Sequence, residues 1–211
     1  MKYESLIFDI DGTLWDSRAL VAEGYNIQLK KEGLDHLCVT AEDLKPLFGK
    51  VMTEIADVVL ATIPVEQRYD LMERCMDTEN RYLFENECRI GYPKVKETMA
   101  ELAKTHRLFI VSNAQCGYPE LCIEKLGLGD YIEGHMCFGD TGKPKGQTIL
   151  ALMARHGIQN AAYIGDTQGD YEATLDAGIP FIFAAYGFGT PTEWDAKIDD
   201  FTQLPGILET L

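Results

Sequence analysis

Short apolar runs alternate with amphipathic stretches along most of this 211-residue chain. Apolar runs predict five strands, over Ser5–Phe8, Arg107–Val111, His135–Phe138, Ala161–Ile164 and Ile179–Ala184. Apolar residues at helical spacing predict helices from Pro93 to Ala103 and over Tyr118–Leu126, Gln147–His156, Tyr171–Ala177 and Pro205–Leu211. Strands that alternate with helices predict an α/β fold, a Rossmann-like doubly wound parallel sheet with helices on both faces.

Residues 15–88 interrupt this alternation with a pattern that is almost entirely helical. Pro64 marks a break, and a stripe of Tyr69, Met72, Cys75 and Met76 follows at helical spacing. We interpret this stripe as core packing within a helical bundle. The sequence therefore predicts one α/β core in two pieces, residues 1–14 and 89–211, with residues 15–88 inserted as a smaller helical unit.

Polar side chains follow the apolar runs at the points where the strands are predicted to end. They are Asp9 and Asp11, Ser112 and Asn113, Asp140 and Lys143, and Asp166 and Asp170. Ligands bind outside the carboxyl ends of the strands in open α/β sheets. If the strands are parallel and adjacent, these side chains converge on one crevice.

The residue types in this set favour phosphoryl transfer. An aspartate such as Asp9 can attack phosphorus, and a second acid such as Asp11 can protonate the leaving oxygen and later activate water. Crowded carboxylates, Asp166 among them, repel one another, so we expect Mg²⁺ to hold them. Lys143 and the Ser112 hydroxyl can then bind the oxygens of the transferring phosphoryl group.

Composition narrows the classes of partner. Acidic residues number 34 against 19 basic ones, a formal charge of −15, which argues against a nucleic-acid partner. Neither an apolar stretch of roughly 18 residues nor a charged-then-apolar leader is present, so we expect a cytoplasmic protein without a membrane partner. The six cysteines form no C-x-x-C pair and are interpreted as small thiols in a reducing compartment. The number of subunits is left open.

Four motifs in this order resemble the haloacid dehalogenase-like hydrolase superfamily. FDIDGTLWDS resembles the first motif, D-x-D-G-T, and VSN resembles the second, an apolar strand that ends in Ser or Thr. GKP resembles the third motif with its lysine, and IGDTQGD resembles the fourth, G-D-x-x-x-D. The resemblance covers nearly the whole chain. The helical insertion between the first and second motifs resembles the helical cap of phosphoglycolate phosphatase-like members of this superfamily.

The resemblance implies specific roles for the residues at the strand ends. Asp9 is the nucleophile and a metal ligand, Asp11 is the general acid/base and lends its backbone carbonyl to the metal, and Asp166 ligates Mg²⁺. Asp170 either binds the metal through water or orients the lysine of the third motif.

The phosphate-binding residues implied by the resemblance are Ser112, with Asn113 beside it, and a lysine. Two lysines compete for this last role, because the chain reads K-P-K-G where relatives commonly carry K-P-x-P. The Lys-Pro pair and the distance to Gly157 favour Lys143 over Lys145.

These residues predict a Mg²⁺-dependent phosphatase that acts on a small phosphomonoester of the phosphoglycolate or sugar-phosphate type. Asp11 argues against a dehalogenase, since those relatives lack the second acid. A phosphonate hydrolase would need a Schiff-base lysine in the cap, for which Lys50 is the candidate. Lys50 could instead be a solvated surface lysine, which we favour, or bind the far end of the substrate. A phosphomutase would need more basic groups than Arg18 after the first motif. A non-catalytic phosphate-binding regulator on the same fold is the alternative from another class.

Overall fold

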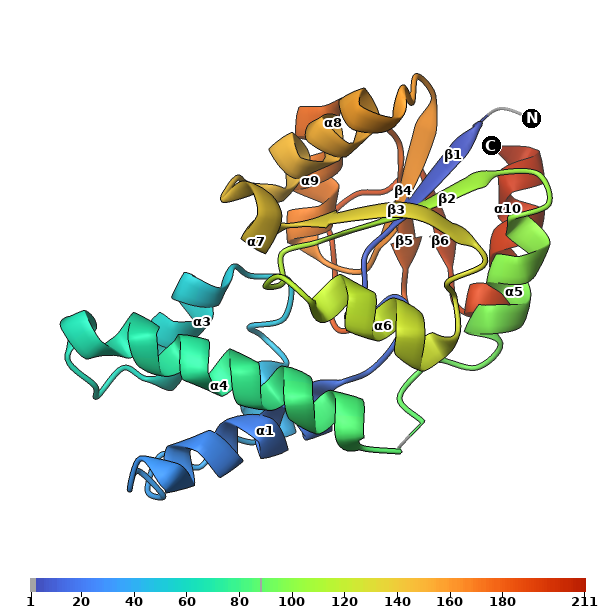
Figure 1. The fold of residues 1–211 in the computed structure, drawn as a ribbon. Helices are drawn as coiled ribbons and strands as arrows, with labels where there is room; N and C mark the ends of the chain where they lie inside the picture. The colour runs from blue at the N-terminus through green and yellow to red at the C-terminus, as the bar shows by residue number, and fades with distance from the viewer. Residues whose placement is uncertain (1–2, 88) are drawn as a thin grey trace. The chain divides into compact units, whose positions relative to one another are not determined.

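A computed structural model describes residues 3–87 and 89–211 of the chain (Figure 1). The chain divides into two compact units, Met1–Asp16 with Gly91–Leu211, and Ser17–Ile90. The unit boundaries fall two residues after those expected from the sequence, and Cys88 lies outside the described residues. None of the helices formed by the described residues is long and apolar enough to cross a membrane.

The larger unit is built on one parallel sheet of six strands. The strands are β1 (Ser5–Phe8), β2 (Arg107–Ser112), β3 (Ile132–Cys137), β4 (Ala161–Gly165), β5 (Phe181–Ala184) and β6 (Ala196–Ile198), in the spatial order β3-β2-β1-β4-β5-β6. The central strands are buried over their whole length, which is why they read as continuous apolar runs. The predicted α/β fold with a Rossmann-like parallel sheet is confirmed.

Helices cover both faces of this sheet, as a doubly wound fold requires (Figure 1). They are α5 (Val95–Leu102), α6 (Tyr118–Leu126), α7 (Phe138–Thr141), α8 (Lys145–His156), α9 (Gln168–Ala177) and α10 (Leu204–Thr210), with a 3₁₀ turn at Phe201–Gln203 before the last. Alternate strand residues such as Ile7, Phe109 and Tyr163 pack against Ile149 and Leu152 of α8 in one buried core. Helices α5 and α10 pack against each other on the other face.

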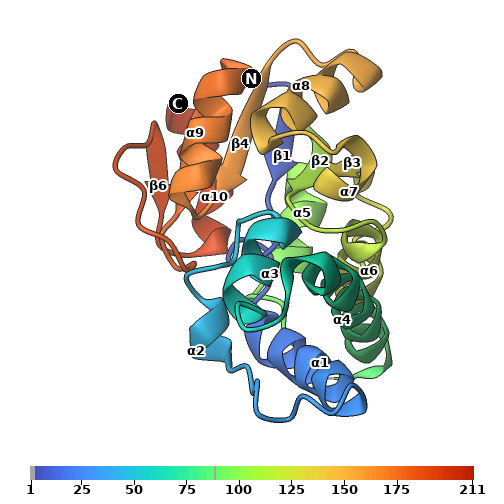
Figure 2. The same cartoon turned by 90° about the vertical axis from the view of Figure 1, so that its left-hand side faces the viewer.

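The smaller unit holds four helices and no strand among its described residues. They are α1 (Arg18–Lys31), α2 (Ala41–Leu44), α3 (Met52–Val59) and α4 (Val65–Glu85), and Figure 2 shows α1 and α4 side by side. A buried hydrogen bond, 2.8 Å from Thr78 Oγ1 to Gln28 Oε1, joins the two long helices. The prediction that the stripe on α4 packs in the core was wrong at Tyr69. This side chain is 40% exposed, and its hydroxyl donates to Asp57 Oδ1 of α3 at 3.2 Å.

Candidate active site at the carboxyl ends of the strands

The sheet register places three of the candidate residues at one edge. Phe8 at the end of β1 pairs with Ile110 of β2 and with Ile164 of β4. Asp9 therefore lies one residue beyond this level of the sheet, while Ser112 and Asp166 each lie two residues beyond it. All three side chains are buried, at 3%, 5% and 0% exposure respectively. Parallel pairing thus gathers polar groups that are more than 150 residues apart in sequence.

The lysine beside Asp9 is Lys145. Its ammonium is buried and donates to Asp9 Oδ1 at 2.9 Å and to Asp170 Oδ1 at 2.6 Å. Lys143 is exposed, so the sequence-based preference for Lys143 was wrong about which lysine reaches the carboxylates.

The start of α8 explains this difference. The helix was expected to begin at Gln147 but begins at Lys145, with Pro144 as an extended N-cap at φ −52° and ψ 150°. Lys145 therefore shares the buried helix face with Ile149 and Leu152, which lie four and seven positions later. That spacing was a sequence signal that could have identified Lys145, whereas Lys143 precedes the proline in a segment outside the helix.

Asp170 is saturated by hydrogen-bond donors. Its Oδ2 accepts from Asp166 N at 3.1 Å, Thr167 N at 2.9 Å and Thr167 Oγ1 at 2.8 Å. Thr167 accepts in turn from Asp170 N, which completes a capping box at the start of α9. With Lys145 on its other oxygen, Asp170 is arranged to orient that lysine, one of the two roles that the motif left open.

Asp166 is held on one side only. Its Oδ2 accepts from Phe188 N at 2.6 Å and Gly189 N at 3.3 Å, while its Oδ1 is buried and has no hydrogen-bond partner among the described residues. A buried carboxylate oxygen without a donor is costly unless a cation binds it.

The neighbouring carboxylates make this position suitable for a hard cation. Ligand atoms of Asp9, Asp166 and Asp170 all lie within 4.8 Å of one another. These three carboxylates and the Lys145 ammonium carry a formal charge of −2, which one divalent cation would balance. The all-oxygen donor set fits Mg²⁺.

Burial and charge shift the protonation of this cluster. Burial and the neighbouring Asp170 raise the pKa of Asp9 to about 7, against the opposing effect of Lys145. Burial, with Asp170 and Asp9 nearby, raises the pKa of Asp166 well above its ordinary value. Burial opposes ionisation of Asp170 as well, but Lys145 and the Thr167 hydrogen bonds hold the pKa of Asp170 below its ordinary value. Asp170 is therefore the ionised partner of the Lys145 ammonium. Asp9 and Asp166 have too little positive charge nearby to offset the burial of their ionised forms.

The Asp11 carboxylate is fixed by two aromatic side chains that the sequence did not single out. Trp15 Nε1 and Tyr118 Oη each donate to Asp11 Oδ1 at 2.8 Å, and the two rings meet edge to face at 5.5 Å between centroids. Trp15 is fully buried, and Tyr118 begins α6. Two donors on one oxygen restrict the rotation of this side chain.

Gly12 lets the loop after β1 approach Asp166. Its φ is +81°, and a Cβ at this position would lie 2.3 Å from Asp166 Oδ2. A side chain would therefore be strained by the backbone and would collide with the candidate metal ligand.

The remaining candidates are Ser112 and Asn113 at the end of β2, and Lys50 in the other unit. Ser112 Oγ accepts from Ala114 N at 3.3 Å, at the end of β2, and Asn113 next to it is partly buried. Lys50 lies in an exposed bend of the smaller unit, between α2 and α3. Its role toward a substrate stays a prediction.

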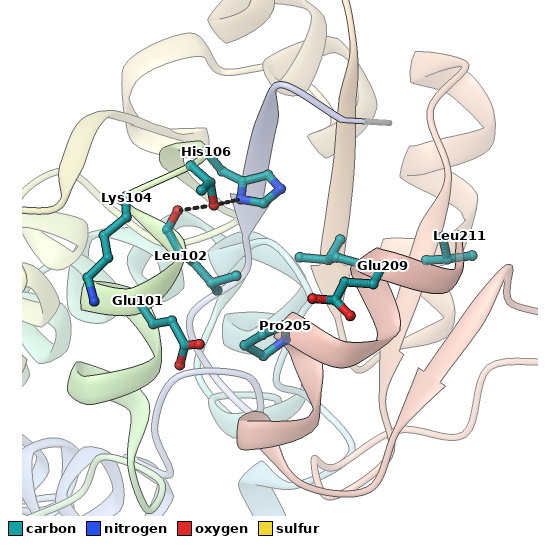
Figure 3. Close-up of a pocket in the computed structure, with 9 residues that line it drawn as sticks. Glu101, Leu102, Lys104, His106, Pro205, Glu209 and Leu211 are labelled. Atoms are coloured by element: carbon teal, nitrogen blue, oxygen red, sulfur yellow. Dashed lines mark hydrogen bonds between the residues drawn. The ribbon is translucent and has the colours of Figure 1, made fainter. Parts of the chain in front are cut away.

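A separate cavity of about 570 Å³ lies between α5 and α10 (Figure 3). Its lining includes His106, which precedes β2 directly, so the cavity is at the amino ends of the strands and away from Asp9. His106 Nδ1 lies 2.9 Å from Thr105 Oγ1, and burial lowers the pKa of His106. Glu101 and Glu209 in the lining are exposed. The cavity lacks the buried carboxylate and lysine arrangement of the strand ends, which is the better candidate site.

Comparison with known proteins agrees with this geometry. A family model described as haloacid dehalogenase-like hydrolase matches residues 6–184. A phosphoglycolate phosphatase of Agrobacterium fabrum is 32% identical over 97% of this chain and 92% of its own, and one of Rhodobacter capsulatus is 28% identical over 97% and 96%.

Solved structures of low sequence identity share the fold. A predicted phosphoglycolate phosphatase from Haemophilus somnus 129PT superposes with a TM-score of 0.83 at 22% identity, covering 99% of both chains. A haloacid dehalogenase-like family hydrolase from Streptococcus pneumoniae gives a TM-score of 0.82 at 18% identity, covering 98% of this chain and 99% of its own.

Proposed function

Because the chain belongs to the haloacid dehalogenase-like hydrolase family, we propose that it is a Mg²⁺-dependent phosphatase acting through an aspartyl-phosphate on Asp9. The substrate is a small phosphomonoester of the phosphoglycolate or sugar-phosphate type, in keeping with the names of the relatives. The observation that carries the proposal is the buried Asp9, hydrogen-bonded by a lysine that Asp170 orients, beside the Asp166 oxygen that has no donor in the described part of the chain.

Asp9, Asp166 and the backbone carbonyl of Asp11 would hold the metal ion. When bound, Mg²⁺ supplies positive charge that offsets the repulsion between the Asp9 carboxylate and an anionic phosphoryl group. Asp170 supports this site indirectly, because both its oxygens already accept hydrogen bonds from Lys145 and the start of α9.

The first half of the reaction forms a bond between an Asp9 carboxylate oxygen and phosphorus and breaks the bond from phosphorus to the leaving oxygen. The Asp11 carboxyl gives its proton to that oxygen, and the product alcohol leaves. Trp15 and Tyr118 determine where the Asp11 carboxyl points at this step. Lys145 and Ser112 bind the oxygens of the transferring group.

The second half reverses the role of Asp11. Its carboxylate takes a proton from water as the water oxygen bonds to phosphorus, and the bond between Asp9 and phosphorus breaks to release phosphate. Asp9 is regenerated as a carboxylate beside Lys145, so the chain returns to its starting state.

Turnover of phosphoglycolate and of p-nitrophenyl phosphate with Mg²⁺ tests the proposal. We expect Asp9→Asn to abolish both activities. Asp11→Asn should lose far more activity on phosphoglycolate, whose alkoxide needs a proton, than on p-nitrophenyl phosphate, whose leaving group is a weak base. A purified protein that turns over neither compound would favour a non-catalytic regulator instead.

A panel of phosphorylated metabolites ranked by kcat/KM identifies the substrate class. In the panel, transfer of phosphate to a second sugar position would indicate a mutase, and cleavage of a phosphonate would indicate a phosphonate hydrolase. We expect hydrolysis of phosphomonoesters to dominate. Lys50→Ala should raise KM for phosphoglycolate if Lys50 recognises the substrate's far end, and should leave p-nitrophenyl phosphate unaffected.

A further inference from the structure

A second group of potential metal ligands lies at the edge of the sheet, beside β3. Cys116 comes from the loop after β2, Cys137 is the last residue of β3, and Asp140 belongs to α7. One ligand atom from each of these three lies within 4.8 Å of the other two. We propose that this thiol cluster, Cys116, Cys137 and Asp140, binds one thiophilic divalent cation of the zinc class.

The Asp140 carboxylate lies between the two sulfurs. Its Oδ2 is 3.2 Å from Cys137 Sγ, and its Oδ1 is 3.8 Å from Cys116 Sγ. Cys137 N donates to Asp140 Oδ2 at 2.8 Å and so sets the direction of the carboxylate. Hydrogen bonds of this kind orient ligands around metal ions in proteins. The three groups therefore face one another at the end of β3.

The backbone around the thiol cluster is fastened independently of any ion. Gly139 N donates to Ala114 O at 3.1 Å, which joins α7 to the loop after β2. A Cβ at position 139 would lie 2.4 Å from Cys116 N and 2.8 Å from Cys116 Sγ. This approach therefore requires glycine, and it holds the two thiols near each other.

Burial and exposure in the thiol cluster suit a bound cation that enters from solvent. Cys137 is buried, while Cys116 and Asp140 are exposed, so an ion has an open path to a partly enclosed position. Burial and the hydrogen bond to Asp140 raise the pKa of Cys137 to about 12. Each thiol that ligates would lose its proton to water as the sulfur–metal bond forms.

The donor set selects the kind of cation. Two sulfurs and one carboxylate favour Zn²⁺ and related ions, with a fourth position for water, whereas Mg²⁺ prefers oxygen ligands alone. The thiol cluster is thus chemically distinct from the carboxylates around Asp9. A cation here would link the loop after Ser112 to the segment that leads to Lys145. The proposal does not depend on the phosphatase activity.

Cobalt(II) in place of zinc gives a direct test with the reduced full-length protein. With excess Mg²⁺ to occupy oxygen sites, we expect one equivalent of Co²⁺ to produce a thiolate-to-metal charge-transfer band in the near ultraviolet, which Zn²⁺ then removes. Cobalt bound by carboxylates alone gives no such band. Cys116→Ser and Cys137→Ser should each weaken the band severely, and Asp140→Asn should weaken affinity at least about tenfold.

Cys38→Ser provides a matched control, because Cys38 is exposed in the other unit and should leave the cobalt band unchanged. Cys116 is also exposed, so its replacement tests ligation without disturbing the core. A band that is absent from the parent protein, or that survives in both the Cys116→Ser and Cys137→Ser variants, would overturn the proposal. The thiols would then serve only as hydrogen-bond donors, to Asp140 and, for Cys137, to Gln115 O as well.

Discussion

Replacing the candidate nucleophile Asp9 by Asn should stabilise the metal-free protein relative to the parent increasingly as the pH rises, while abolishing its activity. Asp9 is 3% exposed, and burial raises its pKa from 3.8 to about 7. The folded protein therefore holds a proton on Asp9 over a pH range in which the unfolded chain has lost it. The stability associated with this carboxyl is fully present below about pH 4 and is lost as the pH rises to about 7.

The size of the effect follows from the two pKa values. Each unit of difference corresponds to about 1.4 kcal/mol, so full ionisation of Asp9 costs the folded state about 4 kcal/mol. Asn resembles the protonated carboxyl but does not titrate. The difference in the free energy of unfolding between Asp9→Asn and the parent should therefore widen by about 3 kcal/mol between about pH 5 and pH 8. The Asn side chain buries an NH₂ group that the carboxyl lacks. The cost of burying it does not depend on pH, so it cancels when the two pH values are compared.

Urea unfolding in the presence of a chelator measures this difference at several pH values, provided the slope m stays constant. Asp130→Asn is a matched control, because it makes the same substitution at an exposed position of the same unit. Saturating Mg²⁺ should stabilise the parent more than Asp9→Asn and narrow the gap. A gap that stays the same from pH 5 to pH 8 would refute the reasoning from burial.

Three further variants test separate parts of the site. Lys145→Met should lower the free energy of unfolding by about 3–5 kcal/mol and abolish turnover, because it leaves buried carboxylates unpaired, whereas Lys143→Met should match the parent in urea unfolding and kcat. Gly12→Ala should destroy Mg²⁺-dependent activity, because the added methyl group collides with the Asp166 carboxylate. Gly142→Ala is its control: Gly142 also has a positive φ, +60°, but no atom of the described residues beyond its chain neighbours lies within 4 Å of the added methyl group, so the change should cost only about 1 kcal/mol of stability. Tyr118→Phe should lower kcat on phosphoglycolate about tenfold or more but change p-nitrophenyl phosphate turnover little, since the ring remains and only the hydrogen bond to the proton donor is lost; equal losses on both substrates would contradict a positioning role.

Hydrophobic patterning was sufficient to predict the larger unit's fold. The strands from Ser5 and Ala161 are buried on both faces, so their sequences are apolar throughout and easily recognised. The polar residues that end them then fall at one edge of a parallel sheet. The α/β fold follows from this order, while the resemblance to the family rests on the four motifs, and both are confirmed.

Elements with little buried surface were missed. Strand β6 is three residues long and only Ile198 in it is buried, and helix α7 is a single turn with none of its residues buried. Such segments depend on their neighbours for stability, so their local pattern is weak. Helix α7 nevertheless places Asp140 beside the thiols of Cys116 and Cys137. The spacing of the cysteines along the sequence did not predict this grouping.

The sequence by itself determined which chemical groups end the strands, because burial imposes a readable pattern on each strand and on the residues that follow. Only the tertiary structure decided between Lys143 and Lys145, since the outcome depends on where α8 begins and which of its faces packs against the sheet. The same holds for the hydrogen bond that Tyr118 donates to Asp11, a residue 107 positions away in the chain. Contacts of this kind arise from packing between elements, and no periodicity within one element encodes them.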